Sequence, residues 1–258
     1  MSNPVAAYRY KTSCARIVGR AHVQNGTPCQ DYVSTRSGRG LACIALADGA
    51  GSRPLSEFGA EAVVKATIRF VSQHFDALWT QAGADAAAVA QQLLDCCLGA
   101  LQRKARRLKC TPDDLACTLL FVAHQQGRYL SGHLGDGFIA RLSETGGVDA
   151  LSHPDNGEFA NTTVFVTDPT APRRLRIARG EGPVGFAIMS DGTAESLYQK
   201  ASRTPAAGAI QKLLNWNATL PRGEMEKILA ANLEQAFAKR SSDDCSIALL
   251  SASQRGAA

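Results

Sequence analysis

The chain has 258 residues, of which 45% are hydrophobic and 20% charged, and its formal net charge is +5 at pH 7. These proportions are typical of a globular protein that buries a large core. No segment approaches the roughly 18 uninterrupted apolar residues of a membrane-spanning helix, and residues 1–12 lack the apolar core of an export signal. We therefore expect a cytoplasmic protein without a membrane partner.

The basic residues are dispersed, apart from the run at 103–107 (Arg-Lys-Ala-Arg-Arg). A polar helix face explains this run more simply than nucleic-acid binding does, so no nucleic-acid partner is predicted. The eight cysteines lie in apolar periodic segments or on predicted helices, and none has a Cys or His partner at zinc-finger spacing. Reduced thiols without a chemical role are therefore expected.

Two strands and two long helices are predicted in the first half of the chain. The strands cover residues 13–19 and 41–47, and the second is continuously apolar, which indicates burial on both faces. From Leu55 to about His74 the apolar residues recur at helical spacing, and a second amphipathic stretch follows at 84–108. A Thr-Pro-Asp-Asp sequence then breaks the helix.

Strands dominate the middle of the chain, and helices follow them. Short connections join three strand candidates at 116–124, 127–133 and 137–142, which predicts an antiparallel meander. Weaker strand signals and the remaining elements follow in this order: strands at 148–151, 162–167, 174–178 and 185–189, helices at 193–200, 205–215 and 223–239, and a closing strand at 246–250. Without regular strand-helix alternation, one α+β domain over residues 1–258 fits better than a doubly wound sheet.

Four short acidic segments lie beside apolar runs, at 29–31, 47–51, 190–192 and 242–245. Asp48 directly follows the buried strand, and Asp191 ends a later one. An isolated Asp-Gly pair is usually a turn, but two pairs in matching contexts are more informative. Carboxylates at strand ends can converge on a hard cation such as Mg²⁺ or Mn²⁺, which prefers oxygen ligands.

The motifs taken together resemble those of the metal-dependent PP2C (PPM) family of protein Ser/Thr phosphatases, in a divergent bacterial branch. They are Gly19-Arg20-Ala21-His22 with Gln30-Asp31, Asp48-Gly49-Ala50-Gly51, Ala116-Cys117-Thr118 with Gly135-Asp136-Gly137, Ser190-Asp191-Gly192, and Asp243-Asp244-Cys245-Ser246. The resemblance implies an α-β-β-α sandwich of two antiparallel sheets flanked by helices. It also implies a site for two or three Mg²⁺ or Mn²⁺ ions at one end of the sandwich.

The resemblance further implies roles for individual residues. Asp48 would bridge two metals, and the Gly49 carbonyl would bind one of them. Asp191 and Asp243 would hold the other metal directly, which makes Asp48 and Asp191 central to catalysis. Asp31 would bind a metal through a water molecule, and Asp136 would bind the third metal. Gln30, Thr118 and Asp244 would support the metal ligands from behind.

The first motif departs from the common family pattern at two positions. His22 stands where many members carry a phosphate-binding Arg, and Gln30 replaces a Glu. The contact to the substrate phosphate is therefore assigned to His22, with Arg20 or Arg53 as substitutes. A structural role for His22 in its loop, and a turn role for Asp136, stay open.

Metal ions would make a nucleophilic side chain unnecessary. Water on a metal has its pKa lowered toward neutrality, and two cations ~3.5 to 4 Å apart can hold both the attacking oxygen and a phosphoryl oxygen. The leading hypothesis is a metal-dependent phosphatase for phosphoserine and phosphothreonine, acting on a Ser/Thr kinase or on its targets. The alternatives are a phosphatase-like module that recognises phosphoproteins without turnover, and a hydrolase of small phosphate esters.

Overall fold

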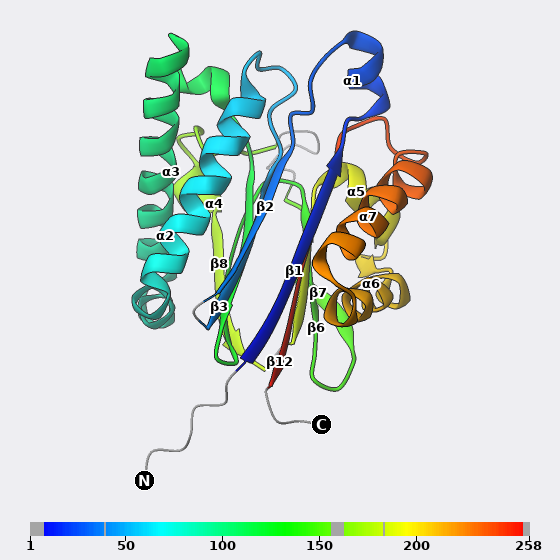
Figure 1. The fold of residues 1–258 in the computed structure, drawn as a ribbon. Coiled ribbons are helices and arrows are strands. Elements are labelled where there is room, and N and C mark those ends of the chain that lie inside the picture. Colours follow the sequence, from blue (N-terminus) through cyan, green and yellow to red (C-terminus); the bar gives the residue numbers. More distant parts are fainter. Residues whose placement is uncertain (1–7, 39, 156–162, 183, 255–258) are drawn as a thin grey trace.

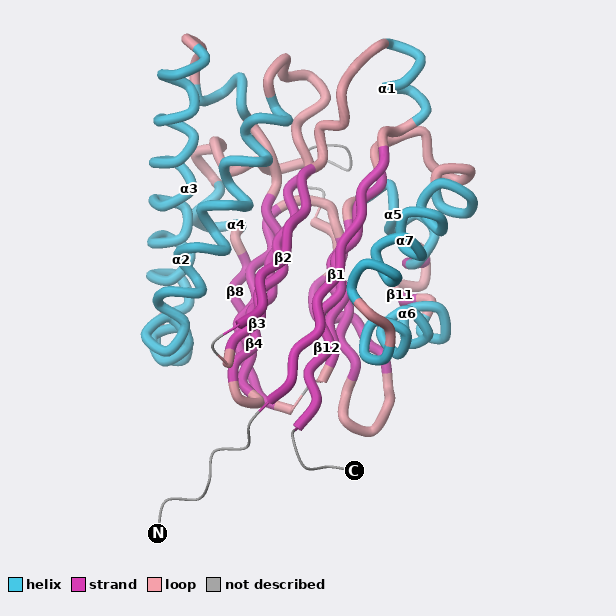
Figure 2. The backbone as a smooth tube through the Cα atoms, viewed as in Figure 1, coloured by secondary structure: helices cyan, strands magenta, loops and turns pink. Residues whose placement is uncertain are grey.

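Two antiparallel five-stranded sheets pack face to face, and helices cover the outer face of each (Figures 1 and 2). The computed structural model describes residues 8–38, 40–155, 163–182 and 184–254. The predicted α-β-β-α sandwich is therefore confirmed. Both ends of the described chain, Tyr8 and Gln254, lie at the same end of the sandwich, because they are paired across neighbouring strands.

One sheet pairs the first strand of the chain with the last, whereas the other is built from strands between these two. One sheet has the order β1 (Tyr8–Ile17), β12 (Cys245–Gln254), β9 (Gly185–Met189), β6 (Phe138–Leu142) and β7 (Val148–Ser152). The other has the order β2 (Tyr32–Gly38), β3 (Leu41–Ala47), β4 (Leu119–Gln125), β5 (Arg128–Leu134) and β8 (Arg176–Glu181). Strands β1 and β12 pair over ten residues, so the first and last acidic segments approach each other.

Two long antiparallel helices, α2 (Ser56–Ala84) and α3 (Ala86–Leu108), cover the sheet that contains β3 (Figure 1). Helices α5 (Asp191–Leu197), α6 (Ala207–Thr219) and α7 (Arg222–Asn232), with the π-helical turn η2 (Leu233–Phe237), cover the other sheet. The short elements are α1 (Arg20–Asn25), the 3₁₀ helix η1 (Pro112–Leu115), α4 (Ala171–Arg174), β10 (Tyr198–Gln199) and β11 (Thr204–Pro205). Of the helices in the described residues, none has the length and apolarity needed to cross a membrane.

Strand β3 shows why a continuously apolar run was predicted to be buried on both faces. Successive side chains of a strand point to opposite faces of its sheet. Ala42, Ile44 and Leu46 accordingly pack into the core between the sheets, whereas Cys43 and Ala45 pack against α2 and α3. All seven residues of the strand are buried.

The predicted meander of three strands is wrong in its last member. Strands β4 and β5 pair as expected, but β6 pairs with β7 and β9 in the opposite sheet. The connection through Gly135 and Asp136 therefore crosses from one sheet to the other. The weak strand signal at 162–167 also fails: residues 163–167 form no strand, and residue 162 lies outside the described part of the chain.

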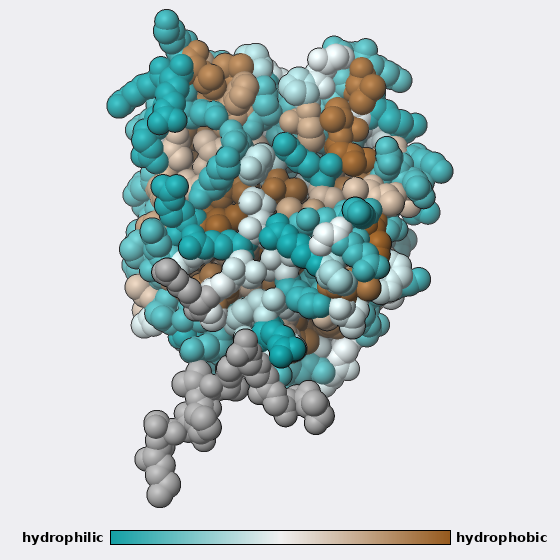
Figure 3. Space-filling model, in the orientation of Figure 1, coloured by the Kyte–Doolittle hydropathy of each residue, from teal (hydrophilic) through white to brown (hydrophobic). Residues whose placement is uncertain are grey.

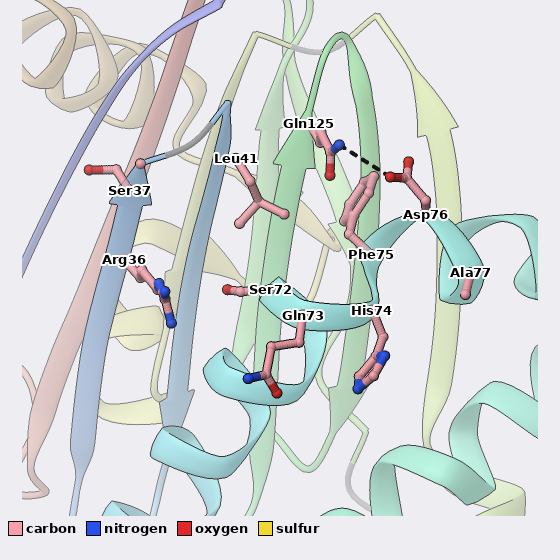
Figure 4. Close-up of a pocket in the computed structure, with 11 residues that line it drawn as sticks. Arg36, Ser37, Leu41, Ser72, Gln73, His74, Phe75, Asp76, Ala77 and Gln125 are labelled. Atoms are coloured by element: carbon pink, nitrogen blue, oxygen red, sulfur yellow. Dashed lines mark hydrogen bonds between the residues drawn. The ribbon is translucent and has the colours of Figure 1, made fainter.

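The helical spacing of apolar residues predicted a helix that ends at about His74. Helix α2 instead continues beyond this residue, but it is kinked there. His74 has φ −123° and ψ 17°, which is not helical. Figure 4 shows the kink beside a cavity of about 870 Å³, which is lined by residues of α2, by residues of β2 and β3 near their hairpin, and by Gln125 at the end of β4. This cavity adjoins Leu41 at the start of β3, away from Asp48 at the end of the strand.

Candidate active site

The acidic segments meet at the end of the sandwich opposite the chain ends (Figure 1). Asp48 follows the last residue of β3, and Asp191 begins α5 after the end of β9. Asp243 precedes the start of β12, and Asp136 lies in the crossing between the sheets. Both sheets thus contribute carboxylates to one place.

The backbone around Asp48 is held rigidly on both sides. Its N–H donates to Oγ1 of Thr118 at 2.9 Å, and the N–H of Thr118 donates to the Asp48 carbonyl at 2.8 Å. The N–H of Gly49 donates to the Gln30 carbonyl at 3.2 Å. A Cβ at Gly49 would lie only 2.7 Å from Oγ of Ser56 and 2.8 Å from the Gln30 carbonyl oxygen, so a side chain does not fit there.

The carboxylates surround a cavity of about 200 Å³. Asp191 accepts a hydrogen bond from the N–H of Gly192 at 2.6 Å, and Asp136 accepts one from the Thr163 hydroxyl at 2.6 Å. Asp243 is exposed at the rim. The residues that line the cavity and were predicted from the sequence are His22, Gln30, Asp48, Gly49, Thr118, Asp136, Asp191 and Asp243.

Asp31 lies behind this lining rather than in it. Its side chain is fully buried, and neither carboxylate oxygen has a well-formed hydrogen bond to a described residue. Arg16 approaches it only through a hydrogen bond to the Asp31 backbone carbonyl. Buried polar atoms in native proteins are normally paired, so these two oxygens indicate a missing partner.

Burial and mutual repulsion raise the pKa values of the inner carboxylates. Burial raises the pKa of Asp31 to about 8, with Asp244 contributing and nearby serine hydroxyls opposing. Burial, followed by the charges of Asp136 and Asp243, raises the pKa of Asp191 to about 7. The pKa of Asp48 rises well above its usual value for the same two reasons. No Lys or Arg is among the described residues that line the cavity, so no such side chain in this lining offsets the negative charge of the carboxylates.

Asp244 is not among the residues that line the cavity, and it connects the segment before β12 to the first motif. Its side chain is 3% exposed, and its two oxygens accept hydrogen bonds from the N–H groups of Gly19 at 2.7 Å and Gln30 at 2.6 Å. Nδ1 of His22 lies 3.0 Å from Oδ1 of Asp244. The structure therefore places Asp243 at the cavity and Asp244 behind it.

The two arginines considered for the phosphate do not line the cavity. Arg20 is exposed, and its guanidinium donates to the Ser241 carbonyl at 3.4 Å. Arg53 is also exposed, and its carbonyl accepts a hydrogen bond from the Gln30 side chain. Sequence reasoning missed Thr163 and Phe165, which line the cavity, because their irregular segment carries no motif.

A profile described as Protein phosphatase 2C matches residues 18–234. The chain belongs to the protein phosphatase 2C family. It is 25% identical over 246 residues to serine/threonine-protein phosphatase 3 of Escherichia coli K12, a match that covers 91% of this chain and 95% of the relative. Phosphatases of this family are metal-dependent, and the protein is a phosphoprotein phosphatase.

Two solved structures share the fold. A serine/threonine phosphatase of S. agalactiae superposes with a TM-score of 0.61 at 14% identity, over 94% of this chain and 99% of that one. RsbX, solved in complex with magnesium, superposes with a TM-score of 0.57 at 14% identity, over 98% of each chain. At these identities the likeness concerns the fold.

Proposed function

We propose that this phosphatase hydrolyses phosphoserine and phosphothreonine in proteins, that it uses two or three Mg²⁺ or Mn²⁺ ions, and that it opposes a Ser/Thr kinase. The observation that supports this proposal best is the convergence of Asp48, Asp136, Asp191 and Asp243 on one cavity without a Lys or Arg in its described lining. We call these four residues and Asp31 the carboxylate cluster.

The donor atoms of the carboxylate cluster fit hard divalent cations. All are oxygens, and a nearby cation would stabilise the two buried oxygens of Asp31, neither of which has a well-formed hydrogen bond to a described residue. We assign direct contacts to Asp48, to the Gly49 carbonyl, to Asp191 and to Asp243. We assign Asp31 a contact through water, and Asp136 a third ion. Bound ions would lower the pKa of water and neutralise phosphoryl oxygens.

His22 is the residue of this chain best placed to contact the substrate phosphate. It lines the cavity, and its Nδ1 is directed toward Asp244, which leaves Nε2 for the substrate. A donor at Nε2 would bond a phosphate oxygen, while Nδ1 lies 3.0 Å from the buried carboxylate of Asp244. Arg20, bonded to a carbonyl outside the cavity, is less well placed for this contact.

The two rival functions predict different behaviour. A module that only recognises phosphoproteins is not favoured, because the chain belongs to a phosphatase family and keeps the whole carboxylate cluster. A hydrolase of small phosphate esters would cleave nucleotides and aryl phosphates faster than phosphopeptides. Relative kcat/KM values for the three substrate types therefore separate it from a protein phosphatase.

The direct test compares hydrolysis of a phosphothreonine peptide with Mn²⁺ by the unmodified protein and by variants. Asp48→Asn and Asp191→Asn should each lower kcat/KM at least about 100-fold, which corresponds to about 2.7 kcal/mol of lost transition-state stabilisation. Asp149→Asn is the matched control, since Asp149 is exposed and pairs with Arg141 away from the cavity. Calorimetry should show weaker Mn²⁺ binding in the first two variants only.

Two outcomes would contradict the proposal. One is Mn²⁺-loaded protein that is inert toward phosphopeptides under conditions in which a related phosphatase is active. The other is an Asp48→Asn variant that keeps both its Mn²⁺ affinity and its activity.

A further inference from the structure

A basic groove lies on the outer surface between α2 and α3, away from the sheets. It has a volume of about 470 Å³, and five of the side chains that line it are cationic: Lys65 and Arg69 from α2, and Arg103, Lys104 and Arg107 from α3. Figure 3 shows hydrophilic side chains over these helices, with less polar ones between them. We call this surface, defined by its five cations, the basic groove.

The positive charge of the basic groove is only partly neutralised. Glu61 is the one carboxylate among the described residues that line it, and this residue already pairs with Lys65 at 2.6 Å and with Lys104 at 2.9 Å. The three arginines form no ion pair with any described residue, and all three are exposed. Such a concentration of one sign of charge attracts a partner of the opposite sign.

The floor of the groove favours an acidic peptide over the other polyanions. It is formed by small or apolar side chains, namely Ala62, Ala66, Phe70, Cys96 and Ala100. Single-stranded nucleic acid is usually bound on free aromatic faces, but Phe70 is the one aromatic residue of the groove and already packs on His74, with ring centroids 5.0 Å apart. A concave floor of this kind accepts apolar side chains that are interspersed among Asp and Glu.

The groove starts near the end of the sandwich that holds the catalytic cavity. Helix α2 begins at Ser56, which packs against Gly49, and at a rise of ~1.5 Å per residue Glu61 and Arg69 lie roughly 8 and 20 Å along the helix from there. At the end of α3, η1 leads to Ala116, whose carbonyl accepts a hydrogen bond from the N–H of Ala50 at 2.9 Å. One extended chain can therefore reach both places.

We infer that the basic groove docks an acidic segment of the phosphoprotein substrate, at a distance from the phosphorylated residue. This inference rests on the proposed function, because it makes the groove a determinant of which phosphoproteins the site dephosphorylates. Docking of this kind raises the effective concentration of the phosphorylated residue at the cavity and lowers KM without changing the chemical step.

The test uses two phosphothreonine peptides that differ only in an extension. One peptide carries an extension of acidic and apolar residues, and in the other Gln and Asn replace the Glu and Asp residues of that extension. A Gly/Ser spacer of about 10 to 20 residues, with a mean span of roughly 17 to 25 Å, separates the extension from the phosphothreonine. The groove variant is Arg69→Ala/Arg103→Ala/Arg107→Ala. The matched control is Lys200→Ala/Lys227→Ala/Lys239→Ala, which removes three exposed cations outside the groove.

We expect the acidic extension to lower KM about tenfold in the unmodified protein and in the control. The groove variant should lose this advantage while keeping kcat and its KM for the neutral peptide. Fluorescence anisotropy with the unphosphorylated acidic peptide should show the same pattern for binding, and binding should weaken as salt rises. Thermal denaturation checks that both triple variants are folded.

Three outcomes would overturn the inference. The first is that the two peptides have equal KM values with the unmodified protein. The second is that the control variant loses the KM advantage of the acidic peptide as fully as the groove variant does. The third is that single-stranded DNA, or vesicles of anionic phosphatidylserine, displace the labelled acidic peptide at a lower concentration than an unlabelled copy of the peptide does. If neither peptide is hydrolysed, the proposed function fails, and the anisotropy measurement still decides whether the groove binds acidic peptides.

Discussion

Asp243 and Asp244 are adjacent in the sequence but have opposite environments. Asp243 is exposed at the rim of the cavity, whereas Asp244 is buried and accepts hydrogen bonds from the N–H groups of Gly19 and Gln30. A buried N–H that loses its acceptor costs free energy, because water cannot replace the bond. We therefore expect the two residues to have separable roles, with Asp243 in the proposed metal binding and Asp244 in stability.

Substitution of the two residues by Asn should separate these roles. Asp244→Asn replaces one accepting oxygen by an amide group that cannot accept, so the free energy of unfolding should fall by about 1 to 3 kcal/mol. Asp243→Asn should leave stability without metal nearly unchanged but should weaken Mn²⁺ binding. Urea denaturation and calorimetry measure the two effects. Equal losses of stability in both variants would contradict the assignment.

At this scale the sequence predicted which residues gather but not how each is oriented. Eight predicted residues line one cavity, because their motifs lie before or after strands at the same end of the sandwich. The position of Arg20, turned toward the Ser241 carbonyl, could not be predicted, because it depends on a short helix that has no apolar periodicity. Thr163 and Phe165 reach the cavity by a path that only tertiary packing determines.

At the scale of elements, the close contact between α2 and η1 holds the loops of the site. A Cβ at Gly59 would lie 1.9 Å from the Leu115 carbonyl oxygen, so α2 can approach this backbone only with a glycine there. The next residue, Ala116, accepts the hydrogen bond from Ala50 that fixes the loop after Asp48. Packing of this helix and positioning of the carboxylate cluster are thus coupled.

Gly59→Ala should therefore destabilise the protein by about 2 kcal/mol or more, because backbone atoms must move apart to make room. The control is Gly99→Ala on α3, where the nearest atom to a new Cβ is the guanidinium of Arg103 at 3.4 Å. Alanine there should stabilise the helix by about 0.5 to 1 kcal/mol. Thermal unfolding of both variants checks the pair, and a neutral Gly59→Ala would refute the close contact.

Elements with strong periodicity were predicted well, and short or exposed ones were not. Strands β3 and β9 have the predicted bounds, and α3 differs only at its start. Helix α1 and strand β2 were missed, since α1 has no buried residue and β2 is only half-buried on an edge of its sheet. The sheet change of β6 follows from packing between sheets, which a local pattern of turns does not encode.

For the whole molecule, the site exists only when both sheets are packed together. Asp48 follows a strand of one sheet, whereas Asp191 and Asp243 flank strands of the other. Folding therefore forces carboxylates together that are far apart in the unfolded chain, and their raised pKa values report this cost. Metal binding and global stability are consequently linked.

Without divalent ions, stability should fall as pH rises. The folded state holds protons on Asp31 up to about pH 8 and on Asp191 up to about pH 7, whereas the unfolded chain releases them near pH 4. The free energy of unfolding should drop by about 1.4 kcal/mol per pH unit for each retained proton, and this loss should be complete above the raised pKa values.

Urea denaturation in EDTA at pH 5.5 and pH 8 measures this slope, and excess Mg²⁺ at pH 8 should restore stability. Asp31→Asn should flatten the slope, because it removes a carboxyl group that titrates in this range. Metal-free stability that is constant or rises with pH would show that the cluster is not strained by its own charge.

The central claim is that the carboxylate cluster binds the ions that this phosphatase uses. Anomalous scattering at the manganese edge from Mn²⁺-soaked crystals tests it most directly. Our account predicts peaks beside the carboxylates of Asp48, Asp191 and Asp243. An absence of peaks in the cavity, or a single ion bound instead between His22 and Asp244, would contradict it.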